Sequence, residues 1–280
     1  MDLDTQPASF RARTYALLWH PVVRGALCRM PVARRLYAGW SRAHPFDTAN
    51  GVDTSGYVPA SEIAADPALA ATISPYGGSQ PSIVRRSLER LPDIREYGFV
   101  DIGCGKGRPL LVASAMPFQR LLGIEISPAL GAVAQANAAV MARRFPGLPA
   151  IQIEIGDATA ALMPGPRVVC FIYHPFDASL LSALLGNLER QLQAGLEHVF
   201  LVYYNPIHGS VIDSSRRFQR WSAVTLDYAA AELGYGPDIR DTVVTWQSSP
   251  ARYPALPGAT RPILVDRQGL QARLGTSPSQ

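Results

Sequence analysis

The sequence predicts an α/β protein whose mostly parallel sheet has helices on both faces. From residue 97 onward, short apolar runs alternate with helical patterns, which is the arrangement that builds a parallel sheet. The chain has 280 residues, of which 48% are hydrophobic and 17% are charged. Average globular chains are roughly 25% charged, so this composition excludes extended disorder driven by charge. Most of the chain is therefore expected to fold.

Seven strands are expected, each bounded by turn-forming residues or by a helical pattern. They cover residues 98–103, 121–126, 150–155, 168–173, 198–204, 222–228 and 242–247. The last two are about a dozen residues apart, so they can pair as an antiparallel hairpin at the end of the sheet. Residues 263–265 are a candidate for an additional edge strand, although prolines surround them.

Helical patterns fill the connections between these strands. One helix is expected to begin near Lys106, a second covers residues 128–144, and a third covers residues 178–194. Leucine recurs at helical spacing through the third, which predicts an apolar face packed on the sheet. Asp177 is expected to cap this third helix.

Composition divides the chain into three parts. Residues 1–88 form a basic helical leader and a connecting lid segment, residues 89–248 form the α/β domain, and residues 249–280 form a proline-rich tail. The first 45 residues hold seven arginines and two aspartates. Short amphipathic helices there either dock on the main domain or contact an anionic surface such as a membrane or nucleic acid.

Composition and patterning also bear on localisation and on metals. The longest apolar runs have six residues, far short of the roughly 20 needed to span a bilayer. No continuous apolar signal-peptide core lies near the N-terminus, so we expect a cytoplasmic protein. Three scattered cysteines are too few for a disulfide framework or a four-ligand metal site, and no metal is expected. The predominance of arginine over lysine indicates a GC-rich bacterial gene.

The most informative segment is a buried strand that runs into three alternating glycines at residues 103, 105 and 107. Glycine is needed where φ is positive or where a ligand approaches the backbone, so this turn is suited to a small molecule. A dinucleotide fold would place its third glycine or an alanine at position 108, where Arg108 stands. This departure counts against NAD and FAD, and the spacing of a Walker phosphate loop is absent as well.

This segment resembles the first motif of class I S-adenosylmethionine-dependent methyltransferases. Three similar motifs follow in the family's order: Glu125 ends the second strand, Asp157 follows the third, and residues 173–176, Tyr-His-Pro-Phe, stand at the fourth. The resemblance covers about residues 97–248. It implies a Rossmann-like seven-stranded sheet whose final hairpin is reversed, and S-adenosyl-L-methionine as the cofactor.

The resemblance also implies which residues hold the cofactor. Glu125 would accept hydrogen bonds from the ribose hydroxyls, Asp157 would meet the adenine amine, and Tyr76 would fold over the methionine end. The full set is Tyr76, Asp101, Gly103, Gly105, Glu125, Ile126, Asp157 and Ala158. Each acid also has an ordinary structural interpretation, as a helix cap (Glu125), a turn residue (Asp157) or one half of a salt bridge (Asp101).

Two cations, Lys106 and Arg108, follow the first glycines of the turn. Positive charge is unfavourable at the start of a helix, so their placement suggests a task such as holding the methionine carboxylate. The alternative is that both side chains face solvent.

The fourth motif departs from the family's usual pattern. Methyltransferases that act on amino groups commonly have Asp or Asn there, followed by two prolines and an aromatic residue. Here His174 takes the first place and a single proline follows. A neutral imidazole can accept a proton near pH 7, so His174 is the candidate general base, with Tyr173 beside the transferred methyl.

We therefore expect an enzyme that transfers a methyl group to an unidentified acceptor. A protein or small-molecule amine is favoured over nucleic acid, because the domain with the expected pocket is nearly neutral. The alternative is a non-catalytic S-adenosylmethionine-binding module that recruits a partner or a membrane through the basic leader. The unusual residue His174 keeps this alternative open.

Overall fold

The computed structural model describes residues 14, 17, 18, 23, 42–236, 238–267 and 270–275. The basic leader expected before residue 42 lies almost entirely outside these ranges. Whether its helices dock on the main domain or contact an anionic surface therefore concerns residues outside the described part of the chain. No helix among the described residues is both long enough and apolar enough to cross a membrane.

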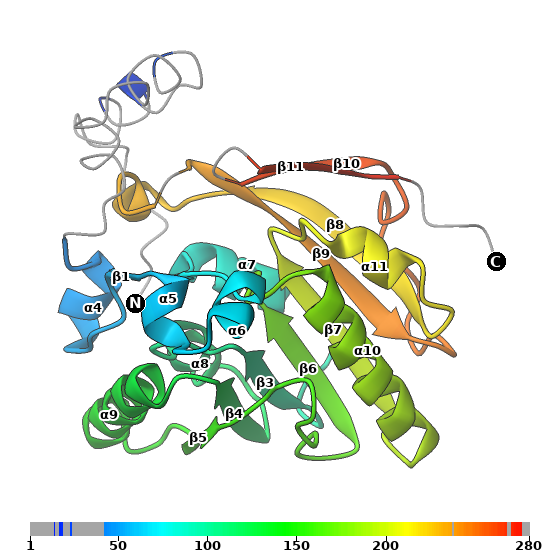
Figure 1. Ribbon diagram of the computed structural model, residues 1–280, viewed down its shortest axis with the longest axis horizontal. Helices are drawn as coiled ribbons and strands as arrows, with labels where there is room; N and C mark the ends of the chain where they lie inside the picture. Colours follow the sequence, from blue (N-terminus) through cyan, green and yellow to red (C-terminus); the bar gives the residue numbers. More distant parts are fainter. Residues whose placement is uncertain are drawn as a thin grey trace.

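The centre of the structure is a seven-stranded sheet with the order β5-β4-β3-β6-β7-β9-β8, which runs from lower left to upper right in Figure 1. Its strands are β3 (Gly98–Ile102), β4 (Arg120–Glu125), β5 (Ile151–Ile155), β6 (Arg167–Ile172), β7 (His198–Tyr204), β8 (Phe218–Asp227) and β9 (Arg240–Ser248). The first five are parallel, whereas β9 runs antiparallel between β7 and β8. The predicted fold class, a Rossmann-like and mostly parallel sheet with a reversed terminal hairpin, is confirmed.

Helices cover both faces of the sheet because alternate residues of each strand point to opposite sides. The helices are α7 (Pro81–Glu89), α8 (Arg108–Ala113), α9 (Pro128–Arg144), α10 (Ala178–Gln193) and α11 (Gly209–Asp213). Val100 of β3 belongs to a core with α10 and α11, whereas its neighbour Phe99 belongs to a core with α7, α8 and α9. Every residue of β3 is buried, as a strand at the centre of the sheet requires.

The helices begin where the sequence supplies a cap or a special turn. Asp177 caps α10 by accepting hydrogen bonds from the amides of Ser179 and Leu180, so the capping role expected of it is confirmed. The helix expected near Lys106 begins at Arg108, directly after the third glycine of the turn, whose φ is 85°.

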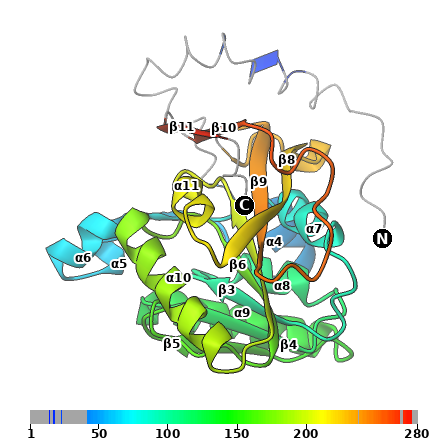
Figure 2. The same cartoon turned by 90° about the vertical axis from the view of Figure 1, so that its right-hand side faces the viewer.

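The connecting lid segment expected before the α/β domain contains short regular elements within residues 44–82. These are α4 (Pro45–Asn50), β1 (Tyr57–Val58), α5 (Ala60–Ile63), α6 (Pro67–Thr72) and β2 (Tyr76–Gly77). We call residues 42–58 the strap and residues 59–79 the lid. β1 of the strap pairs with β2 of the lid, and Figure 2 shows α5 and α6 at the edge of the molecule.

The tail contains a separate two-stranded sheet. β10 (Ile263–Arg267) pairs antiparallel with β11 (Leu270–Leu274), so residues 263–265 form a strand but do not extend the main sheet as expected. Val265 and Leu274 are buried in the same core as Trp246 of β9. The hairpin therefore buries an apolar side. The neighbouring prolines make a strand hard to recognise here from the sequence.

Asp213 at the end of α11 fastens this helix to β8 and β9. Its Oδ1 accepts hydrogen bonds from Arg220 Nε at 2.7 Å and from Trp246 Nε1 at 2.9 Å, and the Arg220 guanidinium also contacts Oδ2. Asp213→Ala would leave the buried Arg220 without its counter-ion, so we expect the free energy of unfolding to fall by about 3–5 kcal/mol. Urea denaturation measures this loss.

The matched control is Asp227→Ala, which breaks the ion pair between Arg240 and Asp227, whose side chains are 61% and 70% exposed. Exposed pairs contribute at most about 1 kcal/mol, so this variant should unfold nearly as the wild-type protein does. Equal losses in the two variants would contradict the structural role of Asp213.

Candidate functional site

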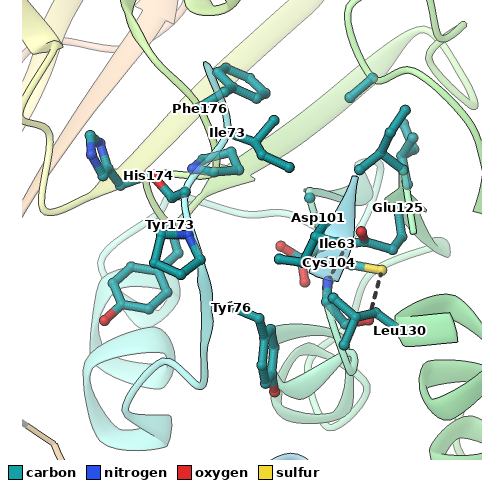
Figure 3. Close-up of a pocket in the computed structure, with 18 of the residues that line it drawn as sticks. Ile63, Ile73, Tyr76, Asp101, Cys104, Glu125, Leu130, Tyr173, His174 and Phe176 are labelled. Carbon is teal, nitrogen blue, oxygen red and sulfur yellow. Dashed lines mark hydrogen bonds between the residues drawn. The ribbon is translucent and has the colours of Figure 1, made fainter. Parts of the chain in front are cut away.

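A cavity of about 230 Å³ lies between the lid and the carboxyl ends of the parallel strands, the edge at which such sheets bind ligands. It is lined by all ten residues that the resemblance implies for the cofactor or that the fourth motif offers for catalysis, namely Tyr76, Asp101, Gly103, Gly105, Glu125, Ile126, Asp157, Ala158, Tyr173 and His174. Arg108 lines it as well, whereas Lys106 does not. Figure 3 shows Tyr173 and Glu125 on opposite sides of this hollow. The structure brings these residues together, and the roles assigned to them remain predictions.

The glycine turn is required by both conformation and close packing. Gly103 and Gly105 have φ values of 68° and 55°, in the left-handed region that favours glycine. A Cβ atom on Gly103 would lie 2.6 Å from Pro175 Cβ, and one on Gly105 would lie 2.3 Å from Tyr76 Cε2. The turn is therefore covered by the fourth motif on one side and by the lid on the other.

Glu125 is tied to the turn by its own carboxylate. Its Oε2 accepts a hydrogen bond from Gly105 N at 2.7 Å, and its Oε1 accepts one from Ser127 N at 2.9 Å. Burial raises the pKa of Glu125, although these two backbone hydrogen bonds act in the opposite direction. A carboxylate oxygen has a second lone pair, so these bonds leave Glu125 able to accept from a ligand.

Asp101 is buried beside the turn with an unsatisfied oxygen. Only 2% of the residue is exposed, and its Oδ2 has no hydrogen-bond partner among the described residues. Burial, and then the charge of Glu125, raise the pKa of Asp101 well above its ordinary value. Nothing in the described part of the chain gives Asp101 the salt bridge that was its structural alternative.

Asp157 has the geometry of an ordinary turn residue and also lines the cavity. Its Oδ1 accepts hydrogen bonds at 2.8 Å from the amide and from the hydroxyl of Thr159. The side chain is exposed, unlike those of Asp101 and Glu125. Both interpretations of Asp157 are therefore compatible with its position.

The fourth motif turns its imidazole away from the two buried acids. His174 Nδ1 lies 3.0 Å from the hydroxyl of Tyr203, and the ring centroid lies 5.1 Å from that of His208. In Figure 3 the ring points away from Asp101 and Glu125. His174 also has a φ of 47°, which a residue other than glycine rarely adopts and which is often found at functional sites.

A buried polar cluster behind Tyr173 has no counterpart in the sequence motifs. The Tyr173 ring lies 4.4 Å from the ring of Tyr204, whose hydroxyl donates to Asp241 Oδ2 at 2.5 Å. Tyr228 donates to the same oxygen at 2.6 Å, and Asn205 Nδ2 donates to Oδ1 at 2.7 Å. Burial, and then the charge of Asp238, raise the pKa of Asp241 to about 6. Its partners lie at the ends of β7 and β8, remote from Asp241 in the sequence, so no local pattern could have identified it.

Neither Lys106 nor Arg108 projects freely into solvent. Lys106 Nζ lies 2.9 Å from Asp53 Oδ1 and donates to the carbonyl of Ser55 at 2.7 Å. Arg108 is only 3% exposed, which contradicts the solvent-facing alternative for this residue. Both cations contact the strap.

The lid is joined to the fourth motif by backbone pairing. Ser74 N donates to the carbonyl of Pro175 at 2.8 Å, and Asp177 N donates to the carbonyl of Thr72 at 2.8 Å. Ile73 and Phe176 form the antiparallel bridge between them, and both line the cavity. The lid therefore covers the cavity with apolar side chains next to the fourth motif.

No family model and no curated protein matches this chain, but solved structures resemble it. Ribosomal protein L11 methylase from Lactobacillus delbrueckii subsp. bulgaricus is 16% identical with a TM-score of 0.37, and the match covers 59% of this chain and 75% of that chain. TrmN from Thermus thermophilus is 16% identical with a TM-score of 0.41, and the match covers 60% and 48%. A protein in the NADB-Rossmann superfamily from Streptococcus agalactiae is 10% identical with a TM-score of 0.43, and the match covers 64% and 72%.

The match thus spans about half the length of TrmN and more of the other two proteins. A methylase is among the solved structures that this chain resembles. These identities and TM-scores are too low to carry an argument about activity.

Proposed function

We propose that the protein is a methyltransferase that uses S-adenosyl-L-methionine. The observation that supports this most directly is the pair of buried carboxylates, Asp101 and Glu125, which line one cavity beside the glycine turn. Burying carboxylates without compensation is unfavourable, so this pair favours a ligand that brings positive charge and hydrogen-bond donors.

S-adenosylmethionine has an ammonium group, a sulfonium and ribose hydroxyls, which meet this requirement. A dinucleotide would instead bring its pyrophosphate to the turn beside Asp101. Two carboxylates there would repel that negative charge. The electrostatics of the site therefore favour the sulfonium cofactor over NAD or FAD, in agreement with the motif spacing.

The residues present fit this cofactor. We assign Glu125 to the ribose, Ile126, Asp157 and Ala158 to the adenine, and Asp101 with the glycine turn to the methionine end. Tyr76 covers that end from the lid. When bound, the cofactor supplies a methyl group on a sulfonium that is ready for transfer.

The protein's own task is to exclude water and to align the acceptor with the methyl. The pairing of the lid with the fourth motif serves the first purpose. For the second, we assign Tyr173 to the cavity wall beside the methyl. We assign His174 as the general base that takes a proton from the methyl acceptor, which we propose to be a small-molecule or protein amine. Because the imidazole is turned toward Tyr203, this role for His174 requires rotation of its side chain.

S-adenosylhomocysteine is expected to bind the wild-type protein with micromolar affinity, measured by calorimetry. Asp101→Asn should weaken binding at least about tenfold, because the amide does not attract the ligand's ammonium. The unliganded variant should unfold at no lower temperature than the wild type, because the change removes a buried acid and no hydrogen bond to Oδ2. Asp93→Asn, in an exposed pair with Arg95, is the control; unchanged affinity in Asp101→Asn would remove the pocket assignment.

Binding of S-adenosylhomocysteine should weaken as the pH is lowered from neutrality. The raised pKa values of Asp101 and Glu125 mean that both carboxyls gain protons at a higher pH than usual, and the protonated forms do not attract a cation. Methylthioadenosine lacks the ammonium group, so its affinity should change less over the same titration. An identical pH dependence for the two ligands would refute the role of these acids.

His174→Asn tests catalysis separately from binding, because Asn tolerates the positive φ at this position. We expect S-adenosylhomocysteine affinity to be retained while methyl transfer from a labelled donor in lysate falls at least about 100-fold, the usual contribution of a general base. Wild-type protein that binds the ligand but transfers no methyl across broad acceptor panels would favour the non-catalytic module instead.

A further inference from the structure

We propose that Arg108 is a positioning residue that joins the strap to the lid and so holds the Tyr76 ring over the glycine turn. The proposal rests on the proposed function for the identity of the ligand under that ring. The contacts from which we infer this role are all within the protein. The sequence suggested two alternatives for Arg108, namely that it holds the methionine carboxylate or that it faces solvent. The role proposed here differs from both.

Arg108 occupies an unfavourable place for a positive charge. It is the first residue of α8, at the positive end of the helix dipole, and it is buried. A buried guanidinium needs acceptors for its hydrogen bonds and a counter-ion close by. The groups around its head therefore indicate what the residue does.

The guanidinium contacts both the strap and the lid. Nε donates to Thr54 Oγ1 at 2.6 Å and Nη2 donates to the Thr54 carbonyl at 2.8 Å, both in the strap. Nη1 donates to the carbonyl of Ser79 at 2.8 Å, at the end of the lid. The planar fork of arginine makes all three bonds at once, which the single ammonium of lysine cannot do.

Asp47 supplies the counter-ion from inside the strap. Its carboxylate accepts hydrogen bonds from Thr54 N at 2.8 Å and Ser55 Oγ at 2.6 Å, and it also contacts Thr54 Oγ1. Its Oδ1 lies 3.8 Å from Arg108 Nη2, with both side chains 3% exposed. The strap is therefore folded around the same charge that balances Arg108.

Gly78 of the lid leaves the space that the guanidinium fills. A Cβ atom at this position would lie 2.4 Å from Arg108 Nη1, whereas one on the neighbouring Gly77 would have nothing within 4 Å. Neither glycine has a positive φ, so the need for glycine at position 78 is steric. The lid is thus shaped around the head of Arg108.

Tyr76 depends on the same contacts. Its hydroxyl donates at 2.7 Å to the Thr54 carbonyl, the oxygen that also accepts from Arg108 Nη2. Its ring packs on Gly105 more closely than any Cβ there would allow. Because Arg108 holds the chain at Thr54 and at Ser79, it fixes the height of the Tyr76 ring over the turn.

Hydrogen exchange of the full, unliganded chain tests this directly. In Arg108→Lys, amides in a peptide covering residues 74–79 should exchange at least about tenfold faster than in the wild type, while β3 and β6 keep their protection. Gly78→Ala should have the same effect without removing the charge, because it pushes against the guanidinium. Gly77→Ala is the matched control, and its exchange should equal that of the wild type.

Wild-type exchange in residues 74–79 of both Arg108→Lys and Gly78→Ala would overturn the proposal. Should Arg108→Lys fail to fold, Gly78→Ala compared with Gly77→Ala still decides the question. This arm contains no ligand, so its outcome does not depend on whether S-adenosylhomocysteine binds.

A double-mutant cycle separates positioning from direct contact with the ligand. Arg108→Lys and Tyr76→Ala should each weaken S-adenosylhomocysteine binding. The dissociation constant of the double variant should be within about twofold of that of the single variant that binds less tightly. Losses that multiply would mean that Arg108 contacts the ligand itself, which would overturn the proposal. If the wild-type protein bound no S-adenosylhomocysteine, the proposed function would fail while the exchange experiment still tested the contact between strap and lid.

Discussion

The candidate site depends on two carboxylates that are buried close to one another where β3 and β4 end. Burial raises the pKa of both carboxyls, and the charge of Glu125 raises the pKa of Asp101 further. A folded protein retains such a conflict where function requires it, since other residue types would pack there at lower cost. Positive charge and hydrogen-bond donors placed in the cavity would relieve this conflict.

The glycine turn connects this charge to the rest of the molecule. Glu125 accepts a hydrogen bond from the turn, Pro175 of the fourth motif packs on Gly103, and Tyr76 of the lid packs on Gly105. A larger residue at position 103 would displace Pro175, and one at position 105 would displace Tyr76. Three segments that are distant in the sequence therefore meet on a few backbone atoms, which explains why the cavity has a defined shape.

The parts of the fold that could be predicted are those with a local signal. The apolar run before the glycines predicts β3 and the turn, the leucine spacing predicts α10, and Asp177 predicts its cap. All ten predicted site residues line one cavity. Nine of them belong to motifs at the carboxyl ends of parallel strands, which converge on one edge of the sheet, and the tenth, Tyr76, comes from the lid that covers this edge.

The parts that could not be predicted depend on contacts between remote residues. The strap owes its shape to Asp47 and Arg108, whose side chains meet only after folding. The cluster around Asp241 draws on Tyr204 at the end of β7 and on Tyr228 directly after β8. The orientation of His174 is set by Tyr203 and His208. The tail hairpin depends on the apolar surface around Trp246, which no local pattern reveals.

The helices α5 and α6 contain no fully buried residue, although Ile63 and Leu69 from this pair line the cavity. The chain is held more firmly on either side of them, by β1–β2 pairing and by the bridge to Phe176. The segment that shields the cavity is therefore separate from the residues that would recognise the ligand. A ligand could then enter or leave the cavity by movement of these two short helices, while Asp101 and Glu125 stay in place on the sheet.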